Sequence, residues 1–158
     1  MERHIILQPA LKTIKARNTK KMYRLWCDGA SRGNGKNNSQ ASIGGVIKNE
    51  HGHTLVEYSK ILPIGSTNNT AEYESLKYGL RHAMANDIKE ISCNMDSNLV
   101  CQQLNGLWKI RSDHLVTLNS EIQALIKGFN KFELTYIPRN LNSEADALAN
   151  RILDNYYN

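Results

Sequence analysis

The chain has 158 residues, a length that favours one domain with a substantial buried core. Hydrophobic residues make up 41% and charged residues 22%, which are ordinary values for a globular protein. No apolar run approaches the roughly 20 residues of a membrane span, and no secretory signal is evident, so we expect neither a membrane protein nor a secreted one.

The three cysteines, Cys27, Cys93 and Cys101, are odd in number and form no Cys-x-x-Cys pair. This pattern predicts free thiols in the cytoplasm or another reducing compartment, and it argues against a zinc site. Nothing in the sequence points to an obligate protein partner.

The net charge of +5 is concentrated in residues 1–22, which hold six basic side chains and one acidic one. Because the whole chain has 20 basic and 15 acidic residues, the remaining 14 of each sign balance over 23–158. We therefore expect a basic arm over 1–22 and one folded domain over 23–158. Such an arm binds nucleic acid by neutralising phosphates, or it is only a solubilising or disordered leader.

The first strand is predicted over 23–28 and ends in Asp28, followed by a glycine-rich turn that leads to the next strand. A carboxylate at the end of a buried strand is costly unless a partner compensates its charge, so a cationic partner is expected there.

Periodicity and turn residues define the later elements. The predicted strands span 41–48, 54–62, 89–96 and 132–137, and the predicted helices span 67–86, 97–104, 113–128 and from Asn142 or Ser143 to about 153. The 67–86 helix is expected to bury the apolar residues Ala71, Leu76, Leu80, Ala83 and Met84. Three meander strands followed by helix-linked strands predict an α/β fold with a mixed sheet.

Four carboxylates occupy notable places in this pattern: Asp28, Glu72, Asp96 and Asp146. Each has an ordinary explanation, such as a turn for Asp28, a peripheral ion pair for Glu72 and helix capping for Asp96. Three of them lie at strand ends or helix starts, where ligands of such sheets collect. Oxygen ligands without a histidine or cysteine cluster suit Mg²⁺ or Mn²⁺, and two such ions about 4 Å apart hold a phosphodiester for hydrolysis.

Four segments then resemble those of type 1 ribonuclease H: Asp28-Gly-Ala-Ser-Arg-Gly-Asn34, Thr67-Asn-Asn-Thr-Ala-Glu72, Asp96-Ser-Asn and Asn142-Ser-Glu-Ala-Asp146-Ala-Leu-Ala. The resemblance runs from about Tyr23 to Ile152. It implies a ribonuclease H-like fold, a five-stranded mixed sheet with an antiparallel meander beside parallel strands and with helices on both faces. It also implies a Mg²⁺-dependent endonuclease, with Mn²⁺ as an alternative, that cleaves the RNA strand of RNA–DNA hybrids and leaves 3′-hydroxyl and 5′-phosphate ends.

By this resemblance, Asp28, Glu72, Asp96 and Asp146 are the metal-binding catalytic residues. Residues expected to contact the hybrid are Asn34, Asn68, Asn69, Asn98 and Arg139. Amide side chains suit this role because they donate to and accept from a 2′-hydroxyl or a base edge, although asparagines in turns also serve backbone geometry.

Two features depart from the family pattern. The loop before the last helix, 137–142, has no histidine, and Arg139 either contacts a phosphate in its place or is a solvated surface residue. The stretch 106–115 is too short for the basic helix and loop with which some members hold the DNA strand. Trp108, within it, is expected to pack in the core, with stacking on a sugar or base as the alternative.

Two other functions stay open. A binding module that kept the fold would need no carboxylate cluster, since negative charge facing phosphates is unfavourable. A DNA nuclease or resolvase of the same fold would use the same metal chemistry on another substrate.

Overall fold

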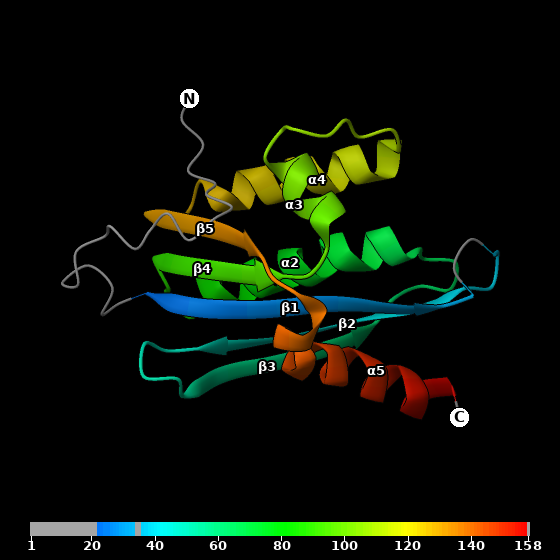
Figure 1. The fold of residues 1–158 in the computed structure, drawn as a ribbon, viewed down its shortest axis with the longest axis horizontal. Coiled ribbons are helices and arrows are strands. Elements are labelled where there is room, and N and C mark those ends of the chain that lie inside the picture. The colour runs from blue at the N-terminus through cyan, green and yellow to red at the C-terminus, as the bar shows by residue number, and fades with distance from the viewer. Residues whose placement is uncertain (1–21, 34–35, 158) are drawn as a thin grey trace.

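Five strands form one mixed sheet in the computed structural model, which describes residues 22–33 and 36–157 (Figure 1). The strands are β1 (Tyr23–Arg32), β2 (Gln40–Lys48), β3 (Thr54–Ile61), β4 (Glu90–Met95) and β5 (Lys131–Tyr136). Their order in the sheet is β3-β2-β1-β4-β5. The β1–β2 and β2–β3 pairs are antiparallel, whereas β1–β4 and β4–β5 are parallel. The predicted mixed sheet is confirmed.

Helices cover both faces of this sheet. They are α2 (Asn68–Ala85), α3 (Asn98–Leu104), α4 (Asp113–Ile126) and α5 (Ser143–Tyr157), with a short 3₁₀ turn η2 (Arg139–Leu141) before α5. A Cβ on Gly29 would meet the backbone of α2, and a Cβ on Gly44 would meet that of α5. Gly29 pairs with Ile43, so these two residues face the same side of the sheet. Gly44, the next residue after Ile43, faces the other side, because successive residues of a strand alternate. The helices α2 and α5 therefore lie on opposite faces. Figure 1 shows α3 and α4 together near β5, and α5 beside β2 and β3.

The α2 helix buries most of its predicted apolar face. Ala71, Leu76, Leu80 and Ala83 are fully buried. Met84 is 41% exposed, so its assignment to the core was wrong. Near the end of the helix, its Cε approaches the site where Gly128 would carry a Cβ, and it therefore packs on the loop between α4 and β5.

The first strand is longer than predicted. It continues past Asp28 to Arg32, which pairs with Gln40, so the glycine-rich turn expected directly after Asp28 was wrong. The antiparallel partner β2 supplies hydrogen bonds along this whole length, and glycine alone does not end a strand that is paired. The parallel pairing of β1 with β4 ends earlier, at Trp26 and Asn94. Asp28 therefore lies where β1 and β4 diverge.

Side-chain caps define the starts of three helices. The hydroxyl oxygens of Thr67, Ser97 and Ser112 accept hydrogen bonds from backbone N–H groups in the first turns of α2, α3 and α4. The cap of α3 is thus Ser97, and the explanation of Asp96 as a capping residue was wrong.

Residues 1–21 of the predicted basic arm lie outside the described residues, while Met22, directly before β1, is buried. Among the described helices, none combines the length and apolarity needed to cross a membrane.

Candidate functional site

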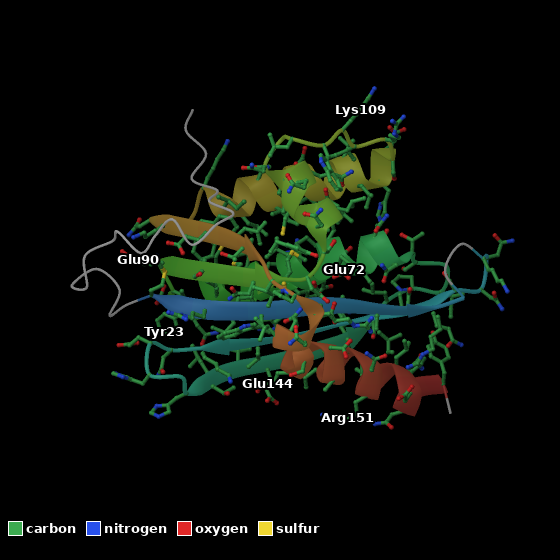
Figure 2. The ribbon with its side chains drawn as sticks, in the orientation of Figure 1. Tyr23, Glu72, Glu90, Lys109, Glu144 and Arg151 are labelled. Carbon is green, nitrogen blue, oxygen red and sulfur yellow. The ribbon has the colours of Figure 1, made fainter. Side chains whose placement is uncertain are left out.

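Three carboxylates meet where β1 and β4 diverge. Asp28 of β1, Glu72 of α2 and Asp96 after β4 each offer an oxygen atom, and these atoms lie within 4.8 Å of one another. Asp28 is 4% exposed and Glu72 8%, and Asp96 is half-buried. Within residues 22–33 and 36–157, no other group of three potential metal ligands is so close together. In Figure 2, Glu72 lies in the middle of the molecule near β1.

Gly29 brings Glu72 to Asp28. A Cβ on this residue would lie 2.6 Å from the carbonyl carbon of Ala71, so only glycine allows the first turn of α2 to approach β1 this closely. The Gly29 N–H donates to Asp28 Oδ1 at 2.9 Å and to Glu72 Oε1 at 3.1 Å. One backbone amide thus holds two carboxylates.

Asp146 reaches the same region from the opposite face of the sheet. Gly44, the strand partner of Asp28, lets α5 approach, because a Cβ there would lie 2.6 Å from the backbone of Ala145 and Ala149. Asp146 Oδ1 accepts from Asn150 Nδ2 at 3.0 Å and lies 3.9 Å from Arg139 Nη2. Asp146 lines the same cavity as Asp28, Glu72 and Asp96, which is described below, but it is outside the group of three carboxylates within 4.8 Å.

Asn142 connects Asp96 to β1. Its Nδ2 donates to the Cys27 carbonyl at 2.9 Å and to Asp96 Oδ1 at 3.1 Å. The backbone carbonyl of Asn142 accepts from the Asp146 N–H at 3.1 Å, which is the main-chain bond of a helix N-cap. Of the two residues predicted to cap the last helix, Asn142 and Ser143, the cap is therefore Asn142. Its side chain, however, donates to Asp96 rather than to the helix.

Burial and mutual repulsion raise the pKa of two of these carboxyl groups. The pKa of Asp28 is about 10, mainly because of burial and then because of the charges of Glu72 and Asp96, and the hydrogen bond with Asp146 adds to the rise. The pKa of Glu72 is about 8, again because of burial and then the charge of Asp96, although the Gly29 N–H partly offsets this. Burial and neighbouring charge therefore disfavour the ionised forms of Asp28 and Glu72 unless a cation compensates them.

In the part of the chain that the structure describes, no basic side chain provides the cationic partner expected at Asp28. None of the ion pairs in the described part of the chain involves Asp28, Glu72 or Asp96. The nearest basic residue of the site, Arg139, faces Asp146. The carboxylate set therefore matches a site for a metal cation, because only oxygen ligands converge on it.

A cavity of about 380 Å³ opens over the carboxylates. Its lining contains Asp28, Gly29, Ala30, Ser31, Asn68, Glu72, Asp96, Tyr136, Arg139, Asp146 and Asn150. Of the residues predicted to contact a hybrid, Asn68 and Arg139 lie in this lining. Asn69 and Asn98 are outside it, and Asn34 lies outside the described residues.

Besides Gly29 and Ala30, three lining residues with polar side chains, Ser31, Tyr136 and Asn150, were missed by sequence reasoning. Tyr136 ends the parallel strand β5, the type of position where ligands collect, and this signal would have found it. Asn150 accepts from Arg32 Nη2 at 3.2 Å, a contact across 118 residues that needs the tertiary structure, and it donates to Asp146 within α5. Ser31 donates to Asn68 Oδ1 at 3.4 Å.

Trp108 is 46% exposed, so the prediction that it packs in the core was wrong. Its neighbour Leu107 is also exposed, on the loop between α3 and α4. Figure 2 shows Lys109 on the same loop at the edge of the molecule.

Comparison with known proteins shows which family and which relatives this chain is similar to. A family model described as reverse transcriptase-like matches residues 27–152. The bifunctional protein Rv2228c of Mycobacterium tuberculosis is 37% identical over 127 residues, which is 80% of this chain and 34% of that protein. The chain thus spans about a third of the length of this relative.

Two solved structures share the fold over nearly their whole length. RNase H1 from the halophilic archaeon Halobacterium salinarum aligns with a TM-score of 0.79 and 34% identity, covering 85% of this chain and 98% of that one. LC11-RNase H1, solved in complex with an RNA/DNA hybrid, aligns with a TM-score of 0.77 and 32% identity, covering 86% of this chain and 99% of that one.

Proposed function

Because the chain belongs to the type 1 ribonuclease H family, we propose that it is a metal-dependent endonuclease that hydrolyses the RNA strand of RNA–DNA hybrids. The products are a 3′-hydroxyl and a 5′-phosphate. The observation that carries this proposal is the convergence of Asp28, Glu72 and Asp96 within 4.8 Å in a cavity that Asp146 also lines.

The four carboxylates fit Mg²⁺, with Mn²⁺ as the alternative ion. Asp28, Glu72 and Asp96 would hold one ion, and Asp146 would help to hold a second. Carboxylate oxygens are the ligands that these hard ions take. When bound, such a pair of ions activates water for attack and stabilises the leaving oxygen. The raised pKa values of Asp28 and Glu72 support this assignment, since a cation in the cavity favours the charged carboxylates.

The residues around the cavity are suited to hold the hybrid. Arg139 lines the cavity, its side chain is 80% exposed, and its Nη2 lies 3.9 Å from Asp146 Oδ1, so it is available for a phosphate beside the carboxylates. Asn68 lies in the lining, and Asn69 and Asn98 extend the polar surface beyond it. These amides, with Asn34, would contact 2′-hydroxyl groups or base edges.

The loop between α3 and α4 would contact the hybrid farther from the carboxylates. The exposure of Trp108 supports stacking on a sugar or base, and neighbouring Lys109 provides a cation for a phosphate. The basic arm would add affinity that does not depend on sequence, through its net charge of +5.

Cleavage of a hybrid labelled in turn on each strand tests the proposed function. With Mg²⁺, we expect cuts in the RNA strand only, with no cleavage in EDTA or by the Asp96→Asn protein. Asp113→Asn is the matched control, because it makes the same change at an exposed site on α4 and should cleave like the wild type.

Each alternative has its own signature in this assay. Tight hybrid binding without cleavage in Mg²⁺ or Mn²⁺ would indicate a binding module. Metal-dependent cleavage of the DNA strand, or of a DNA duplex, would indicate a DNA nuclease or resolvase.

A further inference from the structure

We propose that Asn142 is a positioning residue for the carboxylate site, and that its side-chain amide holds Asp96 in the orientation that binds the divalent ion. This inference rests on the proposed function and concerns the same site. Asn142 itself does not line the cavity, so its effect would be transmitted through Asp96.

The position of Asn142 follows from the divergence of two strands. Parallel pairing between β1 and β4 ends at Trp26 and Asn94, so the next carbonyl of β1, that of Cys27, lies beyond the ladder. Asn142 Nδ2 donates to this carbonyl at 2.9 Å and to Asp96 Oδ1 at 3.1 Å. One amide group therefore connects the residue before Asp28 to the carboxylate of Asp96.

The orientation of this amide is determined by its two acceptors. Both the Cys27 carbonyl and the Asp96 carboxylate need a donor, and the NH₂ group of an asparagine supplies two. Asn142 is 1% exposed, and its Oδ1 is buried without a hydrogen-bond partner. A buried carbonyl oxygen without a partner costs free energy. The amide therefore keeps the two hydrogen bonds that its Nδ2 donates, although its Oδ1 is left without a partner.

A neutral donor is suited to this task. Its hydrogen bond restricts rotation of the Asp96 carboxylate, yet it brings no positive charge that would compete with a metal ion. The backbone carbonyl of Asn142 also accepts a hydrogen bond from the Asp146 N–H. The same residue therefore fixes the start of the helix that carries the fourth carboxylate.

Asn94 provides a matched control for the structural part of this role. Its Nδ2 donates to the Leu25 carbonyl at 3.2 Å, so it also joins another element to a carbonyl of β1. This contact lies two β1 residues earlier and involves no carboxylate. Loss of either amide removes a bond to a β1 carbonyl, but only loss of Asn142 should affect the ion.

The experiment measures Mn²⁺ binding to the full, substrate-free chain by calorimetry, for the wild type, Asn142→Ala, Asn142→Leu and Asn94→Ala. We expect both Asn142 variants to raise the Kd for Mn²⁺ by about 10- to 100-fold, and Asn94→Ala to leave it within about threefold. Asn142→Leu keeps the number and branching of the side-chain heavy atoms and avoids a cavity. For a destabilised variant, the rise of the melting temperature with Mn²⁺ concentration reports the same affinity.

Cleavage kinetics provide the second readout. At a fixed Mn²⁺ concentration, Asn142→Ala should lower kcat with little change in the KM for the hybrid, and a higher Mn²⁺ concentration should restore part of the rate. If Asn142→Ala and Asn94→Ala alter Mn²⁺ affinity to the same extent, Asn142 is only a structural link and the proposal is overturned. If the wild type binds Mn²⁺ but does not cleave, the proposed function fails while the affinity data still decide the role of Asn142.

Discussion

Asp28 illustrates how one residue conflicts with its surroundings. Its carboxyl group lies on a buried strand, shares the Gly29 N–H with Glu72 and has no basic partner within the described residues. Its pKa of about 10 is far above the usual value of 3.8, because burial and neighbouring charges disfavour the ionised form. The unfolded chain, where this group ionises freely, is favoured over the folded state as the pH rises.

The Asp28→Asn protein should therefore be more stable than the wild type in EDTA at pH 7, by about 1–3 kcal/mol. Between about pH 4 and pH 10, folded Asp28 binds more protons than unfolded Asp28, so the stability of the metal-free wild type falls as pH rises through this window. The asparagine side chain of the variant does not titrate, so the variant should lose less stability. Thermal melts from pH 5 to pH 9 measure this.

Mg²⁺ should reduce the difference in stability between Asp28→Asn and the wild type, because ion binding favours the charged carboxylates of the wild type. The variant should also fail to cleave a hybrid. Equal melting temperatures of the two proteins in EDTA at every pH would show that the surroundings of Asp28 do not raise its pKa.

At the scale of secondary-structure elements, two glycines determine how closely the helices approach the sheet. Gly29 faces the first turn of α2, and Gly44 faces α5. In both places the atoms that a Cβ would meet belong largely to helix backbone, which cannot rotate away as a flexible side chain can. The site is thus assembled by close packing from two faces of one sheet.

Gly44→Ala should destabilise the protein by about 3 kcal/mol, because the added methyl group pushes α5 away from β2. Denaturant unfolding measures this change. Ser59→Ala is a suitable control, because Ser59 of β3 pairs with Gly44 but is exposed. This substitution should change the free energy of unfolding by no more than about 0.5 kcal/mol. If Gly44→Ala lowers the free energy of unfolding as little as Ser59→Ala does, α5 moves away from β2 without loss of stability.

At the scale of the whole molecule, the charge is divided between two parts of the chain. Residues 23–158 are balanced, with 14 basic and 14 acidic side chains, whereas residues 1–22 carry a net charge of +5. The domain that would bind a polyanion therefore has no net attraction for it. We propose that the arm supplies this attraction.

Removal of residues 1–21 should weaken hybrid binding and lower the dependence of log K on log salt concentration by about 3–5. Binding is best measured on the Asp96→Asn background, which prevents cleavage. A full-length variant with the six basic residues of the arm changed to glutamine separates charge from length and should behave like the deletion. An unchanged Kd and salt slope would leave the arm as a leader without a binding role.

The sequence by itself determined the main elements and their order, and it singled out the four carboxylates as candidates for the site. Helix caps such as Thr67, apolar periodicity and turn residues are local signals, and they locate the five strands and the four α-helices, although not the end of β1 or the short turn η2. The motif segments were sufficient to indicate the family and the mixed sheet, both of which the structure and the comparisons confirm.

Only the tertiary structure decided how these residues meet. β1 extends to Arg32 because β2 pairs with it there, and Trp108 is exposed because no other element covers its loop within the described residues. Asn142 contacts Asp96 across 46 residues of sequence, and the pKa of Asp28 depends on Glu72 and Asp96 in other elements. Contacts of this kind join residues far apart in the chain, so no local pattern encodes them.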